Sequence, residues 1–578
     1  MLDKKIQRRY AEWMESPIFD ENTKAELAAI EDEKEIEDRF YCDLSFGTSG
    51  MRGKLGAGTN RMNLYLIRKL SQSLGQVICD CGSLALERGV VIAFDSRRFS
   101  YEFALETALV LAACKVRTYL FESLRPTPEL SFAVRYKNAI AGVMITASHN
   151  PKEYNGYKVY WEDGAQISPE QAQKIADKME ECSWDVPSLS QKEALSCGLL
   201  QILGKETDIC YLNCVSEQML QKDLDRQYGK DLCIVYTPLH GAGRSFVEHI
   251  LKENGFSNVM TVPEQSLPDP SFSSAKSPNP EEADAWILAR KYAIQTNADL
   301  LIATDPDSDR LGVQCKDENG GYYHLTGNQT GILLSHYIAL CLKEKNQLNK
   351  DCVLIQSIVS TAFTQNWAEQ QGLRLLHVPV GFKFIGKEIN KLEETKCGTF
   401  FFGFEESLGY LRGTYTRDKD AVLGAALIAE AALYFKIKEG KTLLQVLEEL
   451  FSQYGYFLDE QVSYTLEGKA GKKKIYEIMQ YLESDTRTVL GGQKVTCREY
   501  YEKGIGLTEG RSFELHFPKI NILGITFENG GFIKARPSGT EPKIRFYFCI
   551  AGTTKSHAEE NLAQIKAQFF RPIENLLK

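Results

Sequence analysis

One arrangement recurs three times along this sequence and restricts the chain to an α/β architecture. A short apolar run leads into a turn and a helical pattern, and further along a second apolar run ends in an unusually polar loop. The first runs are residues 90–94, 232–236 and 353–358, and the second runs are 141–145, 299–303 and 399–402. Such alternation is typical of parallel sheets, which bind ligands at the carboxyl ends of their strands. We therefore predict three related α/β units, each presenting a polar loop.

The pattern of predicted strands and helices changes after about Gly455. Strand patterns at 461–466 and 532–535, with helical patterns at 472–483 and 557–569, predict a smaller α+β domain. The predicted fold is α/β, with three similar domains followed by this C-terminal domain. The predicted domains are 1–205, which includes an N-terminal helical extension, then 206–322, 323–456 and 457–578.

Composition excludes several classes of protein. The net charge of −9 and the pI of about 5.7 argue against nucleic acid as a partner, because a phosphate backbone needs a basic face. The longest apolar runs fall short of the roughly 20 residues that span a membrane. The 15 cysteines contain no CxxC motif and follow a charged, helix-like opening without a signal peptide, which favours reduced thiols in the cytoplasm.

The first polar loop, 146–151, places Ser148 directly after an apolar strand. A serine hydrolase is a poor interpretation because no G-x-S-x-G motif surrounds the serine. The neighbouring His149 should also point to the opposite face of an extended chain, which argues against a Ser–His dyad. A turn, with Ser, Asn and Pro selected for backbone geometry, remains open as an alternative.

The second polar loop contains three aspartates in alternation, Asp305, Asp307 and Asp309. Pro306 disfavours a helix at Asp305, so we expect an extended loop whose carboxylates project to one side. Their mutual repulsion favours a hard divalent cation. An EF-hand is excluded because Arg310 stands where that loop requires glycine. The alternative is a polar turn with capping aspartates.

Two further segments suit anionic and hydroxylated ligands. The segment 536–545 combines two guanidiniums, two hydroxyls and a glycine, without a base or nucleophile, and so predicts a cradle for a phosphate that does not react. A surface turn is the alternative. Glu405 and Glu406, followed by Ser407, could accept hydrogen bonds from sugar hydroxyls, although acidic residues also favour a helix N-terminus.

These four loops, together with residues 46–53, resemble the α-D-phosphohexomutase superfamily and specifically its phosphoglucomutase/phosphomannomutase members, over almost the whole chain and in family order. The resemblance implies mixed sheets and four domains around a central cleft. In chain order these domains would bear the phosphoserine, the metal, the sugar and the non-reacting phosphate.

The resemblance also assigns individual roles. Ser148 would be the phosphorylated serine and, with Asp305, Asp307 and Asp309, a ligand of one Mg²⁺ per chain. Arg310 would contact the transferring group, and Arg52 and Lys158 would flank it as donors or acid/base candidates. The implied substrate-binding residues are Lys383, Glu405, Ser407, Lys419, Arg536, Ser538, Gly539, Thr540 and Arg545. Pro306 and Ser308 depart from the family pattern, since many members carry glycine there.

The implied reaction is the interconversion of α-D-glucose 1-phosphate and glucose 6-phosphate by an intramolecular phosphotransferase of the isomerase class. Glucose 1,6-bisphosphate would serve as bound intermediate and activator. Activity on mannose or pentose phosphates, or synthesis of glucose 1,6-bisphosphate, remains open. So does a catalytically inactive protein that binds sugar phosphates, although Ser148 and the three aspartates argue against it. We expect small sugar phosphates as partners, with no nucleic acid and no membrane.

Overall fold

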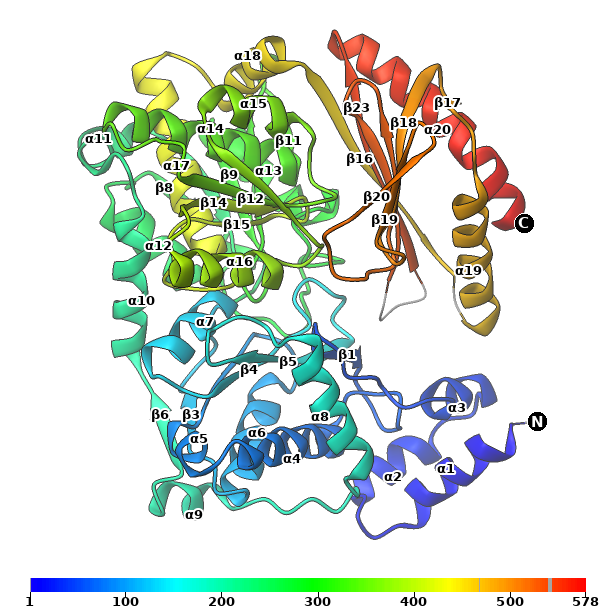
Figure 1. The fold of residues 1–578 in the computed structure, drawn as a ribbon. Coiled ribbons are helices and arrows are strands. Elements are labelled where there is room, and N and C mark those ends of the chain that lie inside the picture. Colours follow the sequence, from blue (N-terminus) through cyan, green and yellow to red (C-terminus); the bar gives the residue numbers. More distant parts are fainter. Residues whose placement is uncertain (1, 467, 539–542, 578) are drawn as a thin grey trace. The chain divides into compact units, whose positions relative to one another are not determined.

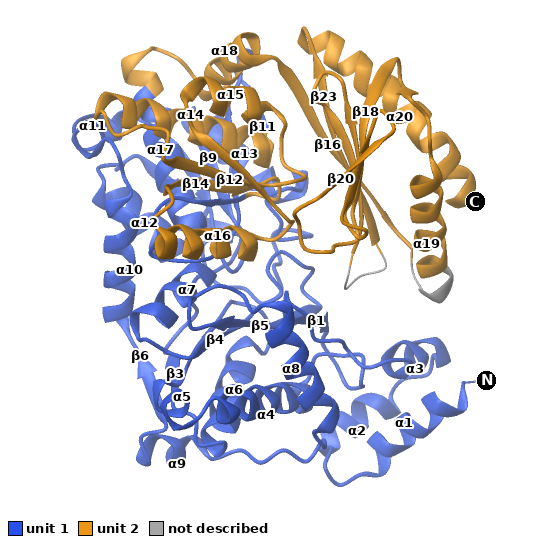
Figure 2. Ribbon diagram, in the orientation of Figure 1, with its two compact units in different colours: residues 1–324, 409–434 blue, residues 325–408, 435–578 orange. Residues whose placement is uncertain are grey.

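The chain forms two compact units, residues 1–324 with 409–434 and residues 325–408 with 435–578 (Figures 1 and 2). The computed structural model describes residues 2–466, 468–538 and 543–577. Within those ranges, no helix is both long and apolar enough to cross a lipid bilayer.

The first unit begins with three short helices that pack on one another around Trp13, Phe19 and Phe40. They are α1 (Lys4–Glu15), α2 (Glu21–Ala28) and α3 (Glu33–Phe40). Each follows an aspartate, Asp3, Asp20 or Asp32, whose carboxylate accepts a backbone N–H of the first turn. These caps explain why the charged opening of the chain is helical.

The first sheet of this unit has the strand order β1-β5-β4-β2-β3-β6 and is mixed: β4, β2, β3 and β6 run parallel, while β5 and β1 pair antiparallel at one edge. Its strands are β1 (Met51–Lys54), β2 (Val90–Phe94), β3 (Thr118–Phe121), β4 (Ala141–Ile145), β5 (Tyr154–Trp161) and β6 (Leu200–Leu203). Its helices are α4 (Leu64–Asp80), α5 (Ser83–Arg88), α6 (Ser100–Ala113), α7 (Thr127–Tyr136), α8 (Pro169–Glu181) and α9 (Gln191–Ser196).

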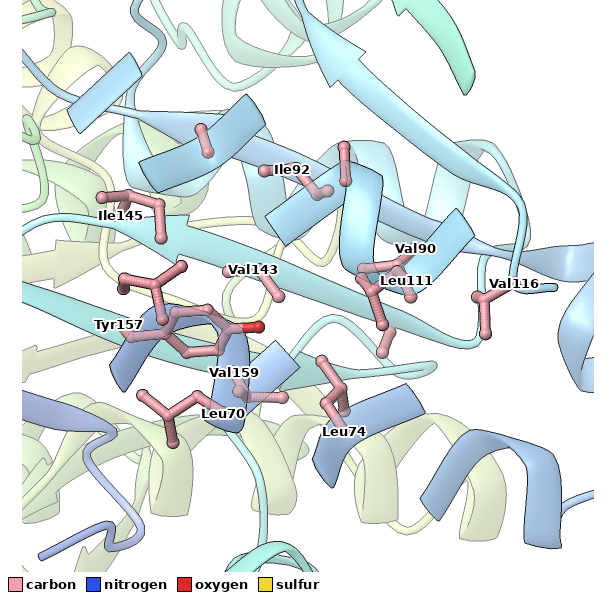
Figure 3. Close-up of a cluster of buried hydrophobic side chains, with 14 of the residues drawn as sticks. Leu70, Leu74, Val90, Ile92, Leu111, Val116, Val143, Ile145, Tyr157 and Val159 are labelled. Carbon is pink, nitrogen blue, oxygen red and sulfur yellow. The ribbon is translucent and has the colours of Figure 1, made fainter. Parts of the chain in front are cut away.

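Both faces of this sheet are buried, as the continuous apolar strands predict. Val90 and Ile92 of β2 lie in the cluster that includes side chains of α4 and α6, which Figure 3 shows in close-up. Their neighbours Val91 and Ala93 belong to a separate cluster with α7 on the opposite face. The two helical layers hold the carboxyl ends of the strands at one rigid edge.

The second sheet has the order β11-β10-β9-β7-β8, again parallel at its centre with an antiparallel pair, β9 and β10. Its strands are β7 (Ile234–Thr237), β8 (Val259–Thr261), β9 (Leu300–Thr304), β10 (Leu311–Lys316) and β11 (Tyr322–Leu325). The helices of this region are α10 (Lys205–Glu217), α11 (Lys222–Tyr228), α12 (Arg244–Glu253) and α13 (Ile287–Thr296). The first unit also includes β15 (Gly409–Leu411) and most of α17 (Ala421–Lys438).

The second unit contains the third α/β region, in which β12 pairs in parallel with both β13 and β14. These strands are β12 (Cys352–Ser357), β13 (Arg374–Val378) and β14 (Thr399–Glu405). The helices are α14 (Gly327–Glu344), α15 (Phe363–Gln371), α16 (Phe382–Thr395) and α18 (Leu443–Tyr454).

The C-terminal part of the second unit is an antiparallel sheet with two long helices. The strand order is β16-β23-β22-β21-β18-β19-β20, and β17 pairs with β18. The strands are β16 (Tyr456–Thr465), β17 (Val489–Leu490), β18 (Gln493–Tyr500), β19 (Ile505–Thr508), β20 (Arg511–Glu514), β21 (Leu523–Phe527), β22 (Phe532–Pro537) and β23 (Lys543–Gly552). Helices α19 (Gly468–Ser484) and α20 (Lys555–Leu577) share a hydrophobic core with the sheet.

The predicted fold class is therefore confirmed: three α/β regions precede a smaller α+β region. The predicted strands 90–94 and 141–145 coincide with β2 and β4, and the other strands of the repeat differ by a few residues at their ends. Continuous apolar runs locate the central strands well because both faces of these strands are buried, whereas strand ends depend on local hydrogen bonds.

Candidate active site

Ser148 lies in the loop after β4 and is enclosed, with 1% of its surface exposed. Its backbone is left-handed, with φ of 53°, and its Oγ donates to Asp305 Oδ2 at 2.7 Å. The same Oγ lies 3.2 Å from His149 Nδ1. The expectation that these neighbours point apart is wrong, because it assumed an extended chain and Ser148 is not extended.

The three aspartates lie on a tight turn between the antiparallel strands β9 and β10. The Ser308 N–H donates to the Asp305 carbonyl at 2.9 Å, and Ser308 has a φ of 54°. The expectation of an extended loop is therefore wrong, and the carboxylates converge because the chain reverses. Their ligand atoms all lie within 4.8 Å of one another. The left-handed backbone at Ser308 is one that glycine adopts without steric cost.

Two lysines neutralise part of this charge. Lys158 Nζ lies 2.7 Å from Asp307 Oδ2, and Lys419 Nζ lies 2.8 Å from Asp309 Oδ2. Burial acts to raise the pKa of both Asp307 and Asp309, but the lysines hold each pKa below its usual range. Burial, reinforced by the charges of its two neighbours, raises the pKa of Asp305 well above its usual range. The charge of Arg310 opposes this rise in the pKa of Asp305 but does not cancel it.

The aspartate turn also offers unused ligand atoms. Among the described residues, the buried Oδ1 atoms of Asp307 and Asp309 have no hydrogen-bond partner. Buried acceptors of this kind are costly to leave unsatisfied. Three converging carboxylates with free oxygens suit a small hard cation, since Mg²⁺ prefers oxygen ligands. The residues present therefore fit a metal site.

The pairing of β1 with β5 brings two more predicted residues to this edge. Arg52 is the register partner of Gly156, and Met144 of β4 is the partner of Lys158. Arg52 Nη1 donates to Asn150 Oδ1 in the Ser148 loop at 3.1 Å. A side chain at Gly156 would meet the carbonyl oxygens of Met51 and Thr146 at 2.6 Å, so glycine is needed for β5 to pass between its neighbours.

Arg310 and Lys419 complete the predicted residues of the first unit. Arg310 follows the aspartate turn, and its Nη1 lies 3.6 Å from Glu281 Oε1. The neighbouring Asp418 helps to position Lys419. Its carboxylate accepts hydrogen bonds from Tyr160 OH at 2.7 Å and from the Lys419 N–H at 2.9 Å. The first unit thus gathers Ser148, the aspartates and both lysines, although Lys419 is distant in sequence.

The second unit gathers the residues predicted to hold the sugar. Glu405 is the last residue of β14, and its Oε1 accepts the Gly381 N–H at 2.7 Å. Lys383 lies in the first turn of α16, and burial, assisted by the charge of Arg536, lowers its pKa to about 8. Ser407 follows β14 and is half-buried. Glu406 instead accepts from Ser357 Oγ at 2.8 Å.

Arg536 and Arg545 are register partners on the antiparallel strands β22 and β23. Like charges directly opposite one another destabilise a strand pair, so this arrangement favours an anion. The Ser538 N–H donates to the Lys543 carbonyl at 2.7 Å and helps to close the end of the strand pair. The predicted residues Gly539 and Thr540 lie outside the described residues.

Two residues that contact the site, Thr127 and Arg97, were not predicted from the sequence. Thr127 donates from Oγ1 to Asp307 Oδ2 at 2.9 Å and from its N–H to the Asp307 carbonyl at 2.8 Å. Nothing near Thr127 in the sequence indicates this contact. Arg97, by contrast, follows the carboxyl end of β2. Because ligand sites of α/β sheets lie at such strand ends, this position could have indicated that Arg97 contacts the site.

Three domain models of the phosphoglucomutase/phosphomannomutase family match the chain. The models are named alpha/beta/alpha domains I, II and III, and they match residues 43–185, 210–320 and 326–454. The phosphoglucomutase of Staphylococcus aureus is 39% identical over 528 residues, covering 90% of this chain and 92% of that protein. The phosphoglucomutase of Staphylococcus epidermidis is 37% identical over 540 residues, covering 92% and 95%.

Solved structures agree on the fold. The open form of parafusin, a phosphoglucomutase from Paramecium, superposes with a TM-score of 0.67 at 19% identity, covering 93% of this chain and 96% of that chain. A phosphoglucomutase/phosphomannomutase family protein from Burkholderia thailandensis gives 0.64 at 17% identity, covering 92% and 97%.

Three α/β regions, an α+β region and a serine hydroxyl beside a carboxylate triad define a phosphohexomutase, an intramolecular phosphotransferase of the isomerase class. The chain belongs to the phosphoglucomutase/phosphomannomutase family. The predictions of the family and of the enzyme class are thereby confirmed.

Proposed function

We propose that this chain interconverts α-D-glucose 1-phosphate and glucose 6-phosphate by phosphoryl transfer to and from Ser148, with glucose 1,6-bisphosphate as bound intermediate and activator. One observation carries the proposal: the Ser148 hydroxyl is enclosed and donates directly to Asp305 of a buried carboxylate triad. A hydroxyl in such a place is suited to exchange a phosphoryl group.

In the first half-reaction the bond between Ser148 Oγ and phosphorus breaks, and the free hydroxyl of the hexose phosphate gains the phosphoryl group. That hydroxyl loses its proton, and Ser148 Oγ gains one to become a hydroxyl again. The bound bisphosphate then reverses its orientation, and its other phosphoryl group is transferred to Ser148. Lys158, Lys419 and Arg52 are the candidates to hold or move the proton and to orient the phosphoryl oxygens. Arg310 is proposed to contact the transferring group.

The metal of this site is proposed to be one Mg²⁺ held by Asp305, Asp307, Asp309 and the phosphoserine. When bound, it would offset negative charge on the transferring phosphoryl group. This assignment is supported by the unpartnered Oδ1 atoms of Asp307 and Asp309.

The residues of the second unit are proposed to bind the parts of the substrate that do not react. Arg536 and Arg545, with Ser538, Gly539 and Thr540, would hold the second phosphate, because guanidiniums give charge-assisted contacts without a nucleophile. Glu405 and Ser407 would accept and donate hydrogen bonds to sugar hydroxyls, with Lys383 beside them. Because the two phosphates of the intermediate exchange roles, each must be able to react at Ser148 and, in turn, to bind to Arg536 and Arg545.

Glucose is proposed as the sugar because the relatives described above are phosphoglucomutases. We also propose small sugar phosphates in the cytoplasm as partners, with no membrane, and the net charge of −9 argues against nucleic acid. The decisive comparison is a coupled assay of glucose, mannose and ribose 1-phosphates with added Mg²⁺. A preference for ribose or mannose, or net accumulation of hexose bisphosphate, would contradict the glucose assignment.

The covalent route is tested with Ser148→Ala, which we expect to lower kcat at least about 10³-fold because the nucleophile is lost. Intact-mass measurement should detect one phosphate on the wild type and none on the variant. Ser335→Ala is the matched control, since its buried hydroxyl donates to the Gly331 carbonyl within its own helix, α14. If Ser148→Ala kept near-normal turnover, phosphorylation of Ser148 would not be on the pathway.

A further inference from the structure

The loop that bears Ser148 is held by one buried guanidinium. Arg97 donates to the carbonyls of Pro151 at 2.8 Å and Tyr154 at 3.0 Å, and it makes two further short hydrogen bonds to the carbonyls of Ser148 and Asn150. Its side chain is 0% exposed. A single planar group therefore binds four carbonyl groups, that of Ser148 and those of three residues that follow it in the chain.

Arg97 is itself fixed at its base. Asp95 Oδ2 lies 3.3 Å from Arg97 Nε, and Asp95 Oδ1 accepts the Arg97 N–H at 2.9 Å. Asp95 also accepts from Thr146 Oγ1 at 2.6 Å and from Ser100 Oγ at 2.7 Å. Since the Thr146 Oγ1 in turn accepts the Ser148 N–H at 2.7 Å, Asp95 supports the loop through two routes.

The other side of the guanidinium is covered by a residue from a distant loop. Arg97 Cζ lies 5.0 Å from the centre of the Phe272 ring, within the range of a cation–π contact. Phe272 is 2% exposed, and Asp269 fastens its loop by accepting the N–H groups of Ser271 and Ser273 at 2.8 and 2.9 Å. The Ser/Pro-rich segment around Phe272 is thus part of the support of the serine loop.

These contacts act on a residue whose backbone is strained. A non-glycine residue in the left-handed region is disfavoured because its Cβ crowds the following carbonyl oxygen, and Ser148 has a φ of 53°. Without the carbonyl contacts, the loop would relax towards an extended backbone and the hydroxyl would leave Asp305. A lysine could not replace Arg97, because an ammonium lacks the planar fork that matches several acceptors at once.

We infer that Arg97, held by Asp95 and covered by Phe272, is a positioning residue that fixes the Ser148 hydroxyl for phosphoryl transfer without touching the phosphoryl group. This inference rests on the proposed function. It predicts that disturbing Arg97 lowers the rate of transfer to Ser148 far more than it lowers substrate affinity, because the residues that hold the sugar remain intact.

The first test is Arg97→Lys, which keeps a charge beside Asp95. The rate at which glucose 1,6-bisphosphate phosphorylates Ser148 is measured by quenched-flow intact mass, alongside kcat, KM and Tm. We expect the phosphorylation rate and kcat to fall about 100-fold, with KM within about threefold of wild type, because small displacements of reacting atoms have effects of this size. Phe272→Leu should lower the same rate several-fold.

Arg88→Lys is the matched control, because the Arg88 guanidinium also donates to backbone carbonyls, those of Asn138 and Ala139, which precede β4, whereas Ser148 follows the other end of that strand. It should leave the phosphorylation rate unchanged. In Arg97→Ala, millimolar guanidine should restore part of the rate and methylamine should not. If Arg97→Ala fails to fold, Arg97→Lys and Phe272→Leu still decide the question.

A folded Arg97→Lys that phosphorylates Ser148 at the wild-type rate would overturn the inference, as would a loss confined to KM. A wild type that takes no phosphate from the bisphosphate would instead remove the proposed function, and this inference with it. The two failures are therefore distinguished by the wild-type measurement alone.

Discussion

Two groups of like charges lie in this molecule, three aspartates on the turn 305–309 and two arginines on β22 and β23. The aspartates are partly balanced by the direct contacts of Lys158 and Lys419. Arg536 and Arg545 form no ion pair with a carboxylate among the residues that the structure describes. The first group therefore needs one further compact cation, whereas the second needs an anion that can be supplied by the substrate.

The two groups also differ in how they are built. The carboxylates converge through a turn whose shape depends on Ser308 and on contacts from α7, and the arginines face one another because of strand register. We expect the turn to act on the rate of chemistry and the strand pair to act on binding. The following three predictions test that division, beginning with the largest effect.

Asp307→Asn should lower kcat by roughly 10²–10³-fold, while KM changes only a few-fold, because the variant holds less firmly the proposed Mg²⁺ and Lys158, the cations that offset negative charge developing in the transition state. Removal of divalent metal from the wild type should have a similar effect that Mg²⁺ reverses. Steady-state kinetics measure the effect of the substitution and of metal removal.

Asp317→Asn is the control, since Asp317 also accepts N–H groups in a turn, from Asn319 and Gly321. Equal losses in kcat and affinity would place Asp307 in ground-state binding.

Arg545→Ala should raise KM about 10- to 100-fold, because a charge-assisted hydrogen bond contributes roughly 1.5–3 kcal/mol, and should lower kcat less. More free glucose 1,6-bisphosphate should also appear per turnover, because the non-reacting phosphate is held less firmly. Arg511→Ala, on the exposed edge strand β20, is the control. The division would break down if Arg545→Ala reduced kcat with KM unchanged.

The smallest effect concerns pH. Burial lowers the pKa of Lys383 to about 8, so Lys383 loses its charge between pH 7 and 9 and KM should rise a few-fold. Lys383→Arg should flatten this profile of KM against pH because a guanidinium stays protonated.

The same lowered pKa affects stability. From about pH 8 to 10.5 Lys383 binds a proton more readily in the unfolded chain than in the folded one. The contribution of Lys383 to the free energy of unfolding therefore rises with pH over this range. Denaturant titrations at pH 8 and 9.5 would contradict this if wild type and Lys383→Arg responded alike.

Much of the fold could be predicted because central strands are apolar on both faces. Residues 90–94 and 141–145 alternate between two hydrophobic clusters, and that pattern is readable without tertiary information. The same holds for the polar loops, since loops at strand ends are the usual ligand sites of α/β sheets.

Backbone handedness and long-range contacts could not be predicted in the same way. The pattern around Ser148 contains no glycine to reveal its left-handed backbone, and Pro306 suggested an extended chain where a turn occurs. The hydrogen bonds of Thr127 to Asp307 and of Arg97 to the Ser148 loop join segments far apart in the sequence. Such contacts follow from sheet topology and leave no local periodicity.

The discontinuous composition of the first unit determines when the site can form during synthesis. Residues 409–434 belong to the unit that starts at the N-terminus. They supply Lys419 to Asp309, and they supply Glu430, which accepts the Leu220 and Gln221 N–H groups. A ribosome-bound chain that ends near residue 324 lacks both contacts. We therefore expect the carboxylate site of the first unit to be completed only after residues 409–434 have been synthesised.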